Sequence, residues 1–179
     1  MTDEVKVDVR RSGRRFDAEA VLDLAADAQT VWDTITDYGA LPRFMPGIRA
    51  CRVVEREALA DGDERLVVEQ QGEFRFLLFA QELRVRLDIE HRGQRVVHAR
   101  ALRFDLGVLK GRALETFEGR YELERGPARG PVNLRYSALI VARLPPPPGI
   151  GSVAVRQNLE TQLRAVVRES ERRAAAGRR

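Results

Sequence analysis

The stretch that decides the fold is residues 27–48, which read DAQTVWDTITDYGALPRFMPGI. Asp27 is suited to cap a short helix, because its side chain can accept from the free N–H groups of a first helical turn. A second short helix follows and stops at a Pro-Gly pair before an apolar strand begins. The segment therefore predicts two short helices within residues 28–45. The apolar face of the first consists of Ala28, Val31, Trp32 and Ile35.

The pattern on either side of this stretch changes to strands and then to one long helix. Apolar residues alternate with charged ones over residues 5–24, around a central Ser-Gly, which predicts a β-hairpin. Further alternating runs, separated by turn residues, fill residues 48–143. The longest predicted strand runs from Phe74 to Glu90. After four consecutive prolines, helical spacing predicts a helix over residues 150–173.

Length and composition predict one globular domain over residues 1–179. The chain is 44% hydrophobic and 32% charged, and single domains commonly have roughly 100 to 200 residues. The start of the chain lacks the pattern of a signal peptide, and its apolar runs are shorter than the roughly 20 residues that cross a bilayer. A lone cysteine, Cys51, fits a reducing compartment. We therefore expect a cytoplasmic protein.

The net charge of +4 raises the question of an acidic partner. The basic residues are interleaved with nearly as many acids, so we predict no specific nucleic-acid binding. Two groups of arginines near the chain ends could still contact an acidic partner. They are Arg10, Arg11, Arg14 and Arg15 near the start, and Arg172, Arg173, Arg178 and Arg179 near the end.

The order of elements predicts an α+β fold in which a twisted antiparallel sheet wraps around the long C-terminal helix. A sheet with one polar face has to bury its other face, and this helix is the long amphipathic element available to cover it. Where side chains are too small to meet, such an arrangement leaves a gap that can hold a ligand.

Several segments resemble the polyketide cyclase/dehydrase branch of the START-like superfamily, which includes coenzyme Q-binding START proteins. The pattern is a helix carrying V-W, then D-Y, then F-x-P-G before a strand, and residues 31–48 match it closely. Gly119-Arg120-Tyr121 is similar to a family G-x-W motif, with Tyr121 as a departure. Val68-Glu69-Gln70 and Leu134-Arg135-Tyr136 also match. The resemblance implies the helix-grip fold.

The resemblance implies three alternative functions, because fold alone does not determine function. The leading hypothesis is binding, with transport or chaperoning as roles, of a lipid, isoprenoid quinone or polyketide-like compound in an internal cavity. The second is a protein-interaction module similar to ribosome-association toxins, and peripheral contact with a membrane or ribosome stays open. The third is a polyketide cyclase or dehydratase. The sequence leaves the oligomeric state open.

Candidate ligand-binding residues are those that the alternation places on inward faces, together with those in the short-helix region. Tyrosines are favoured because a buried hydroxyl needs a partner and can orient a polar head group. Glu115 shares a face with Phe117, so an unbulged strand would point its carboxylate inward. The full set is Tyr38, Phe44, Met45, Phe79, Leu87, Glu115, Phe117, Tyr121, Tyr136, Ile140, Asn158 and Gln162.

The sequence contains no motif for covalent or metal-dependent catalysis. His91 lies in a predicted turn and His98 on a strand, and neither has a second histidine or cysteine at metal-ligand spacing. We therefore predict no metal, no cofactor and no assigned catalytic residue. An acid-base reaction would need only one or two positioned groups, such as His98, Glu115 or a tyrosine.

Overall fold

A computed structural model describes residues 4–76, 79–110, 113–124 and 130–177, without the side chains of Phe76, Phe79, Leu109 and Lys110. In chain order the elements are β1 (Asp8–Ser12), β2 (Arg15–Leu24), α1 (Ala28–Thr36), the 3₁₀ turn η1 (Tyr38–Ala40), α2 (Leu41–Phe44), β3 (Ile48–Ala58), the 3₁₀ turn η2 (Ala60–Gly62), β4 (Glu64–Phe76), β5 (Phe79–Arg92), β6 (Val96–Leu106), β7 (Leu109–Lys110), β8 (Leu114–Leu123), β9 (Val132–Ala142) and α3 (Ile150–Gly177).

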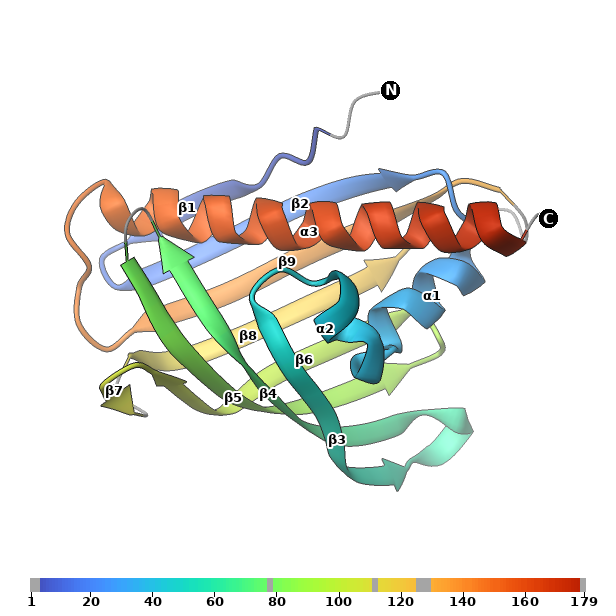
Figure 1. Cartoon of the computed structure of the whole chain (residues 1–179), viewed down its shortest axis with the longest axis horizontal. Helices are drawn as coiled ribbons and strands as arrows, with labels where there is room; N and C mark the ends of the chain where they lie inside the picture. The colour runs from blue at the N-terminus through green and yellow to red at the C-terminus, as the bar shows by residue number, and fades with distance from the viewer. Residues whose placement is uncertain (1–3, 77–78, 111–112, 125–129, 178–179) are drawn as a thin grey trace.

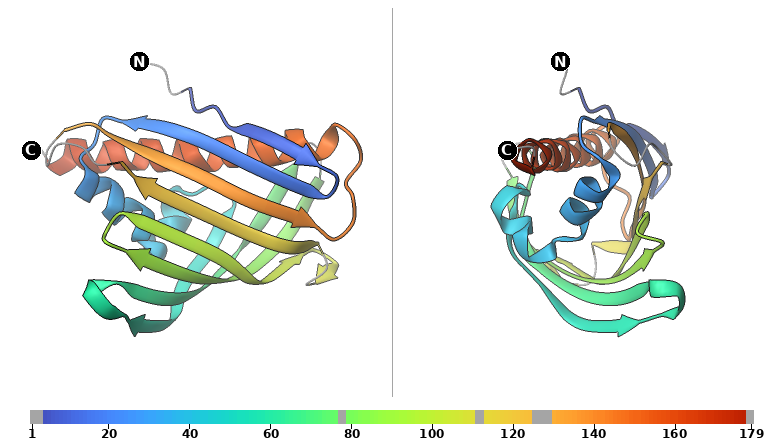
Figure 2. Two further views of the ribbon diagram at one scale, coloured as in Figure 1. Left: turned by 180° about the vertical axis from the view of Figure 1, so that it is seen from behind. Right: turned by 90° about the vertical axis from the view of Figure 1, so that its right-hand side faces the viewer.

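One antiparallel sheet contains all the described strands and curves around α3. Its strand order is β1-β2-β9-β8-β6-β5-β4-β3, with the short β7 paired to β6. The helix lies along the inner face, as Figure 1 shows, and the end-on view of Figure 2 shows the sheet bending around it and the short helices. This is the helix-grip arrangement that the order of elements predicted.

The predicted N-cap of α1 is present. The Asp27 carboxylate accepts from the Thr30 backbone N–H at 2.9 Å and from its hydroxyl at 3.1 Å. The apolar face of α1 buries Val31 completely and Ile35 almost completely, and α1 packs against α3. The short helices therefore close the end of the sheet nearest to the C-terminus of α3 (Figure 1).

The core forms where the middle and the C-terminal half of α3 meet the inner face of the sheet. Leu163 and Val166 of α3 are at most 2% exposed, as are Leu66 and Leu134 on strands far apart in the sequence. Burying one such side chain contributes about 1.5–3 kcal/mol. Toward its N-terminus α3 is less buried, so its attachment to the sheet is weaker there. No helix among the described residues combines the length and apolar character needed to span a membrane.

The outer face of the sheet is covered by arginine–carboxylate pairs, which accounts for the interleaved charges of the sequence. Asp88 accepts two hydrogen bonds from Arg65 at 2.7 Å and one from Arg100 at 2.9 Å, and only 4% of it is exposed. These guanidinium groups lower the pKa of Asp88 in spite of its desolvation. The paired charges make the outer face polar and leave the apolar residues inside.

Some predicted boundaries differ from the structure. The segment from Phe74 to Glu90 is not one strand, because β4 continues through Gly72 and pairs with β5 in a register that places Phe76 opposite Phe79. An uninterrupted apolar run gives no turn signal, so the alternation alone could not locate this hairpin. The C-terminal helix also runs to Gly177 rather than Arg173, because the alanines that follow favour helix.

Gly72 continues the strand because it allows a close approach between β4 and the turn that precedes β3. A Cβ atom built on Gly72 would lie 1.9 Å from the Gly47 carbonyl oxygen. Gly47 has a φ of +81°, and it accepts a 2.8 Å hydrogen bond from Glu73. Glycine at both positions therefore fixes the α2–β3 turn against the sheet.

We expect Gly72→Ala to destabilise the fold by about 1–3 kcal/mol, because the added methyl group would overpack a backbone contact. Gly39→Ala is the matched control, since a Cβ there meets nothing within 4 Å. The control should change the free energy of unfolding by less than about 0.5 kcal/mol. Urea denaturation monitored by circular dichroism measures both, and equal stabilities would contradict the close-approach argument.

Candidate functional site

Two adjoining cavities lie between α3 and the inner face of the sheet. The cavity nearer to α1 has a volume of about 150 Å³, and the one nearer to the N-terminus of α3 has a volume of about 260 Å³. Because they share part of their lining, they adjoin, and we refer to them together as one hollow with two lobes. The shared residues are Gln70, Leu83, Leu87, Phe117 and Gln162.

The lining is mostly apolar and comes from every layer of the fold. The lobe near α1 is bounded by Phe44 and Met45 of the short-helix region and by Ile89 of β5. The other lobe is bounded by Phe104 of β6 and by Val155 and other residues of α3. The two phenylalanines Phe104 and Phe117 have ring centroids 6.2 Å apart. The hollow exists because these side chains do not fill the curve of the sheet.

A surface groove of about 330 Å³ leads to this hollow between the α2–β3 turn, the end of β4 and α3. It shares Leu83, Asn158 and Gln162 with the internal lobes. Gln162 donates from Nε2 to the Asn158 side-chain oxygen at 3.0 Å. The groove is therefore the route by which a molecule could enter between α3 and β4.

Two tyrosine hydroxyls stand in the lobe near α1. Tyr121 and Tyr136 face each other across β8 and β9, with ring centroids 4.9 Å apart. Within the described part of the chain neither hydroxyl has a hydrogen-bond partner. Desolvation raises the pKa of both phenols, and both residues line this lobe. Both hydroxyls are free to bind a polar atom of a ligand.

A third tyrosine, Tyr38, is joined to a buried histidine. Its hydroxyl lies 2.7 Å from Nε2 of His91, and Nδ1 of the same imidazole lies 3.0 Å from a carboxylate oxygen of Glu64. Trp32 packs edge-on against the imidazole, with ring centroids 5.3 Å apart at 73°. Burial raises the pKa of Tyr38. The contacts form a continuous line from the rim of β4 to the cavity wall.

Most of the residues predicted from the sequence to bind a ligand line these cavities, and their role in binding stays a prediction. The short-helix region and the strand alternation placed them correctly. The side chain of Phe79 lies outside the described part of the chain. The residues that do line the cavities are Tyr38, Phe44, Met45, Leu87, Phe117, Tyr121, Tyr136, Ile140, Asn158 and Gln162.

Glu115 does not point inward, because the condition for that orientation, an unbulged strand, is not met. The pairing of β8 with β9 shifts between Leu114 and Thr116, and this bulge turns Glu115 outward. Its carboxylate pairs with Arg14 at 2.9 Å and is half exposed. His98 also points outward, and its imidazole lies 3.4 Å from a carboxylate oxygen of Glu118. Neither side chain reaches the cavity.

The sequence reasoning missed Gln70 and His91. Gln70 follows Val68 by two residues on the inner face of β4, so the alternation did carry that signal. It lies opposite Cys51 in the β3–β4 register, and burial raises the pKa of the Cys51 thiol to about 11. His91 lies in β5 and not in a turn, and it is 5% exposed. Its position depends on a strand that extends to Arg92, beyond the predicted end at Glu90.

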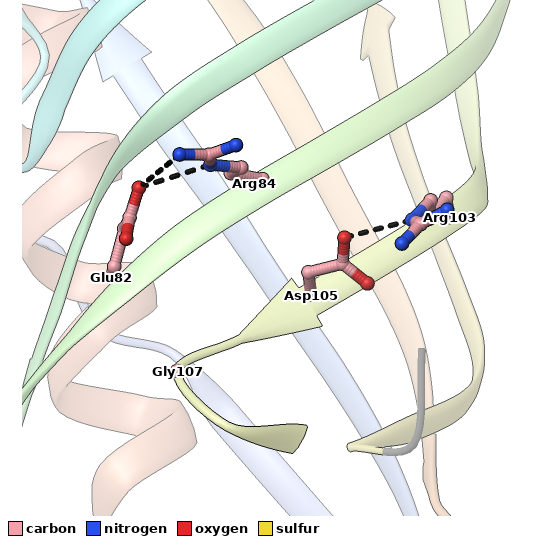
Figure 3. Close-up of a pocket in the computed structure, with 5 residues that line it drawn as sticks. All are labelled: Glu82, Arg84, Arg103, Asp105 and Gly107. Atoms are coloured by element: carbon pink, nitrogen blue, oxygen red, sulfur yellow. Dashed lines mark hydrogen bonds and ion pairs between the residues drawn. The ribbon is translucent and has the colours of Figure 1, made fainter. Parts of the chain in front are cut away.

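A separate hollow of about 190 Å³ lies on the outer face of the sheet, where Figure 3 shows its lining. Arg84 pairs with Glu82 at 2.9 Å, and Arg103 pairs with Asp105 at 2.8 Å. These pairs balance the charge of the hollow internally. In the described part of the chain, no three histidine, cysteine or acidic side chains are grouped as metal ligands.

Comparison with known proteins identified one family model. The model described as "Polyketide cyclase / dehydrase and lipid transport" matches residues 24–167. This range begins at the end of β2 and includes the short helices, the rest of the sheet and most of α3. No curated protein sequence matches the chain significantly.

Three solved structures illustrate the shared fold. A START superfamily protein from Mycobacterium smegmatis has a TM-score of 0.68 at 16% identity, over 89% of this chain and 97% of that one. The Zhui aromatase/cyclase from a Streptomyces species has a TM-score of 0.68 at 20% identity, over 91% and 98%. A STAR-related lipid transfer protein from Xanthomonas axonopodis has a TM-score of 0.63 at 16% identity, over 93% of both chains.

We expect the pKa of His91 in the folded protein to lie below 6.5, because desolvation outweighs its hydrogen bond and charge interaction with Glu64, and Arg56 lowers it further. Neutral His91 then contributes stability that is fully present above pH 6.5 and is lost as the pH falls through the folded pKa. Glu64→Ala should lower the pKa again, whereas Glu115→Ala should not change it. NMR titration of the imidazole measures the pKa, with His98→Asn assigning the signals. A folded value above 6.5 would contradict this balance.

Proposed function

Because the chain belongs to the polyketide cyclase / dehydrase and lipid transport family, we propose that it binds a hydrophobic small molecule in the two-lobed cavity between α3 and the sheet. The class we propose is a lipid, an isoprenoid quinone or a polyketide-like compound. The observation that carries the proposal is the cavity itself, an apolar hollow with unpartnered tyrosine hydroxyls.

The apolar lining supplies enough free energy for useful affinity. Each Å² of apolar surface removed from water contributes roughly 25 cal/mol. A ligand burying a few hundred Å² would therefore gain several kcal/mol, from which the entropic cost of association is subtracted. Binding of this kind needs no charged group, in agreement with a lining of leucine, phenylalanine and valine side chains.

The shape of the site favours an elongated ligand with one polar end. The two lobes measure about 150 and 260 Å³, and ligand pockets are commonly about 300–1,000 Å³. The polar end would lie near Tyr121 and Tyr136, and the apolar body would extend along Leu83 toward Val155. A longer tail would leave through the groove beside Asn158.

An acid-base cyclase or dehydratase is the second candidate. It is favoured by the Tyr38–His91 contact at the cavity wall, and a protein of similar fold is named an aromatase/cyclase. Proton transfer to or from a ligand requires a titratable group at hydrogen-bonding distance. Tyr38, joined to His91 at 2.7 Å, is the cavity residue that we propose for this role, whereas Glu115 and His98 do not reach the cavity.

The protein-interaction alternative gains less support from the described arginines, because they are engaged within the chain. Arg14 pairs with Glu115, and Arg173 pairs with Asp37 at 3.0 Å. Arg11 donates to the carbonyl oxygens of Pro146 and Pro147. An acidic partner would have to replace these contacts. Arg178 and Arg179 lie outside the described residues.

Native mass spectrometry of gently purified protein, followed by solvent extraction, tests the binding proposal directly. A stoichiometric adduct that yields a lipid, quinone or aromatic polyketide would support it and identify the ligand class. The decisive contrary result is an apo mass combined with no saturable uptake of the neutral fluorescent probe N-phenylnaphthylamine.

We expect Ala99→Leu to weaken binding of N-phenylnaphthylamine by about tenfold or more, because the larger side chain fills the lobe near α1 and overpacks around the probe. Ala99 lines that lobe opposite Gly119. Ala50→Leu is the matched control, since Ala50 is exposed on β3. Fluorescence titration measures both affinities, and Leu83→Trp at the junction of the lobes provides a second blocking variant. Unchanged affinity in both blocking variants would place the probe elsewhere.

A further inference from the structure

The contacts of Tyr38, His91 and Glu64 fix the direction of each hydrogen bond. An ionised carboxylate can only accept, so Glu64 requires a proton on Nδ1 of His91. A neutral imidazole with its proton on Nδ1 has only a lone pair on Nε2. The Tyr38 hydroxyl, 2.7 Å away, therefore donates its proton to Nε2.

The surroundings keep this line of contacts in place. Arg56 donates to the other carboxylate oxygen of Glu64 at 2.5 Å, so both oxygens of Glu64 are engaged in hydrogen bonds. Glu64 and His91 lie opposite each other in the β4–β5 register. Trp32 of α1 covers the imidazole, which is 5% exposed. The ring therefore has little freedom to turn over and exchange its nitrogens.

The consequence falls on Tyr38, which is one of the residues that line the lobe near α1. The single hydroxyl proton of Tyr38 is used toward His91, so only lone pairs remain for a molecule in the cavity. Tyr121 and Tyr136 differ, because their hydroxyl protons have no partner within the described part of the chain and can rotate toward a ligand. Toward the cavity, Tyr38 can therefore only accept a hydrogen bond, whereas Tyr121 and Tyr136 can also donate one.

We propose that His91 and Glu64 hold Tyr38 as a hydrogen-bond acceptor toward the cavity, so that the ligand is recognised there by a donor such as a hydroxyl group. This inference rests on the proposed binding function. It adds that, at Tyr38, the protein accepts the hydrogen bond and the ligand donates it. The ligand it selects is a hydrophobic molecule with a hydroxyl donor directed at Tyr38. An acceptor such as a ligand carbonyl oxygen fits at Tyr121 or Tyr136 instead. His91 and Glu64 are positioning residues, since they act through Tyr38.

The first test needs no ligand. Multiple-bond NMR correlations of ¹⁵N-labelled protein distinguish the two neutral forms of an imidazole, and the chain has only two histidines. We expect His91 to carry its proton on Nδ1, with His98→Asn used to assign the signals. A proton on Nε2 would overturn the proposal, because Tyr38 would then receive a hydrogen bond and keep its own proton for the cavity.

The second test compares two probes of nearly equal shape, naphthol and its methyl ether. Naphthol can donate to Tyr38, whereas the ether can only accept. We expect the protein to prefer naphthol by about tenfold, the effect of one buried hydrogen bond. Tyr38→Phe should reduce this preference to the baseline set by the extra methyl group. Isothermal titration calorimetry gives both dissociation constants.

The variant His91→Phe separates positioning from a merely structural role. Without Nε2, the Tyr38 proton turns toward the cavity and can bind the ether, so the preference should fall to the Tyr38→Phe baseline. A structural role alone would weaken both probes equally and leave their ratio unchanged, which would overturn the proposal. His98→Phe, on the outer face, is the matched control and should keep the ratio of the unmodified protein.

The outcomes also separate this inference from the proposed function. If both probes bind the unmodified protein in the cavity with equal affinity, and Ala99→Leu weakens both, the binding function stands and the inference about Tyr38 is wrong. If neither probe binds, while N-phenylnaphthylamine also fails to bind, the binding function itself is wrong and the inference falls with it.

Discussion

The structure depends on one packing constraint, which is that the concave face of a curved sheet is covered by a single long helix. Leu163 and Val166 of α3 reach the sheet and complete a core. Toward the N-terminus of α3, small or short residues such as Ala154 line the larger lobe of the cavity. A cylinder of about 10–12 Å diameter cannot fill this space. The cavity is therefore a consequence of the same packing that forms the fold.

The charged outer face contributes to this geometry by favouring one register of the paired strands. Pairs such as Arg65 with Asp88 lie across neighbouring strands, where a one-residue slip would move every apolar side chain to the wrong face. Pairs whose two members are both exposed, unlike Arg65–Asp88, add little stability individually. Their effect is on register, and register decides which side chains line the cavity. The pairs on the sheet thus account for the arginines of its outer face.

The sequence was sufficient for the fold and for much of the cavity wall, because both follow from local periodicity. Alternation in β5 and β9 placed Leu87 and Tyr136 inside, and the Asp27 cap located α1. The same reasoning failed where backbone geometry departs from the regular pattern. The bulge beside Glu115 reverses a side chain without any change in sequence pattern. His91 becomes a cavity-associated residue only through contacts with Tyr38 and Glu64, which are 53 and 27 residues away, and periodicity carries no information about such contacts.

The polar groups of the cavity are costly for an empty protein. A hydroxyl in an apolar cavity without a protein partner makes fewer hydrogen bonds than it does in water, and phenylalanine at Tyr121 or Tyr136 would avoid this loss. The hydroxyl of Tyr38 keeps one hydrogen bond because it contacts His91. This contact requires a buried histidine, whose protonation would lower the stability of the protein. Neither arrangement is needed to complete the core. Both are accounted for if the missing partners are atoms of a bound molecule, because the ligand then satisfies the groups that the fold leaves open.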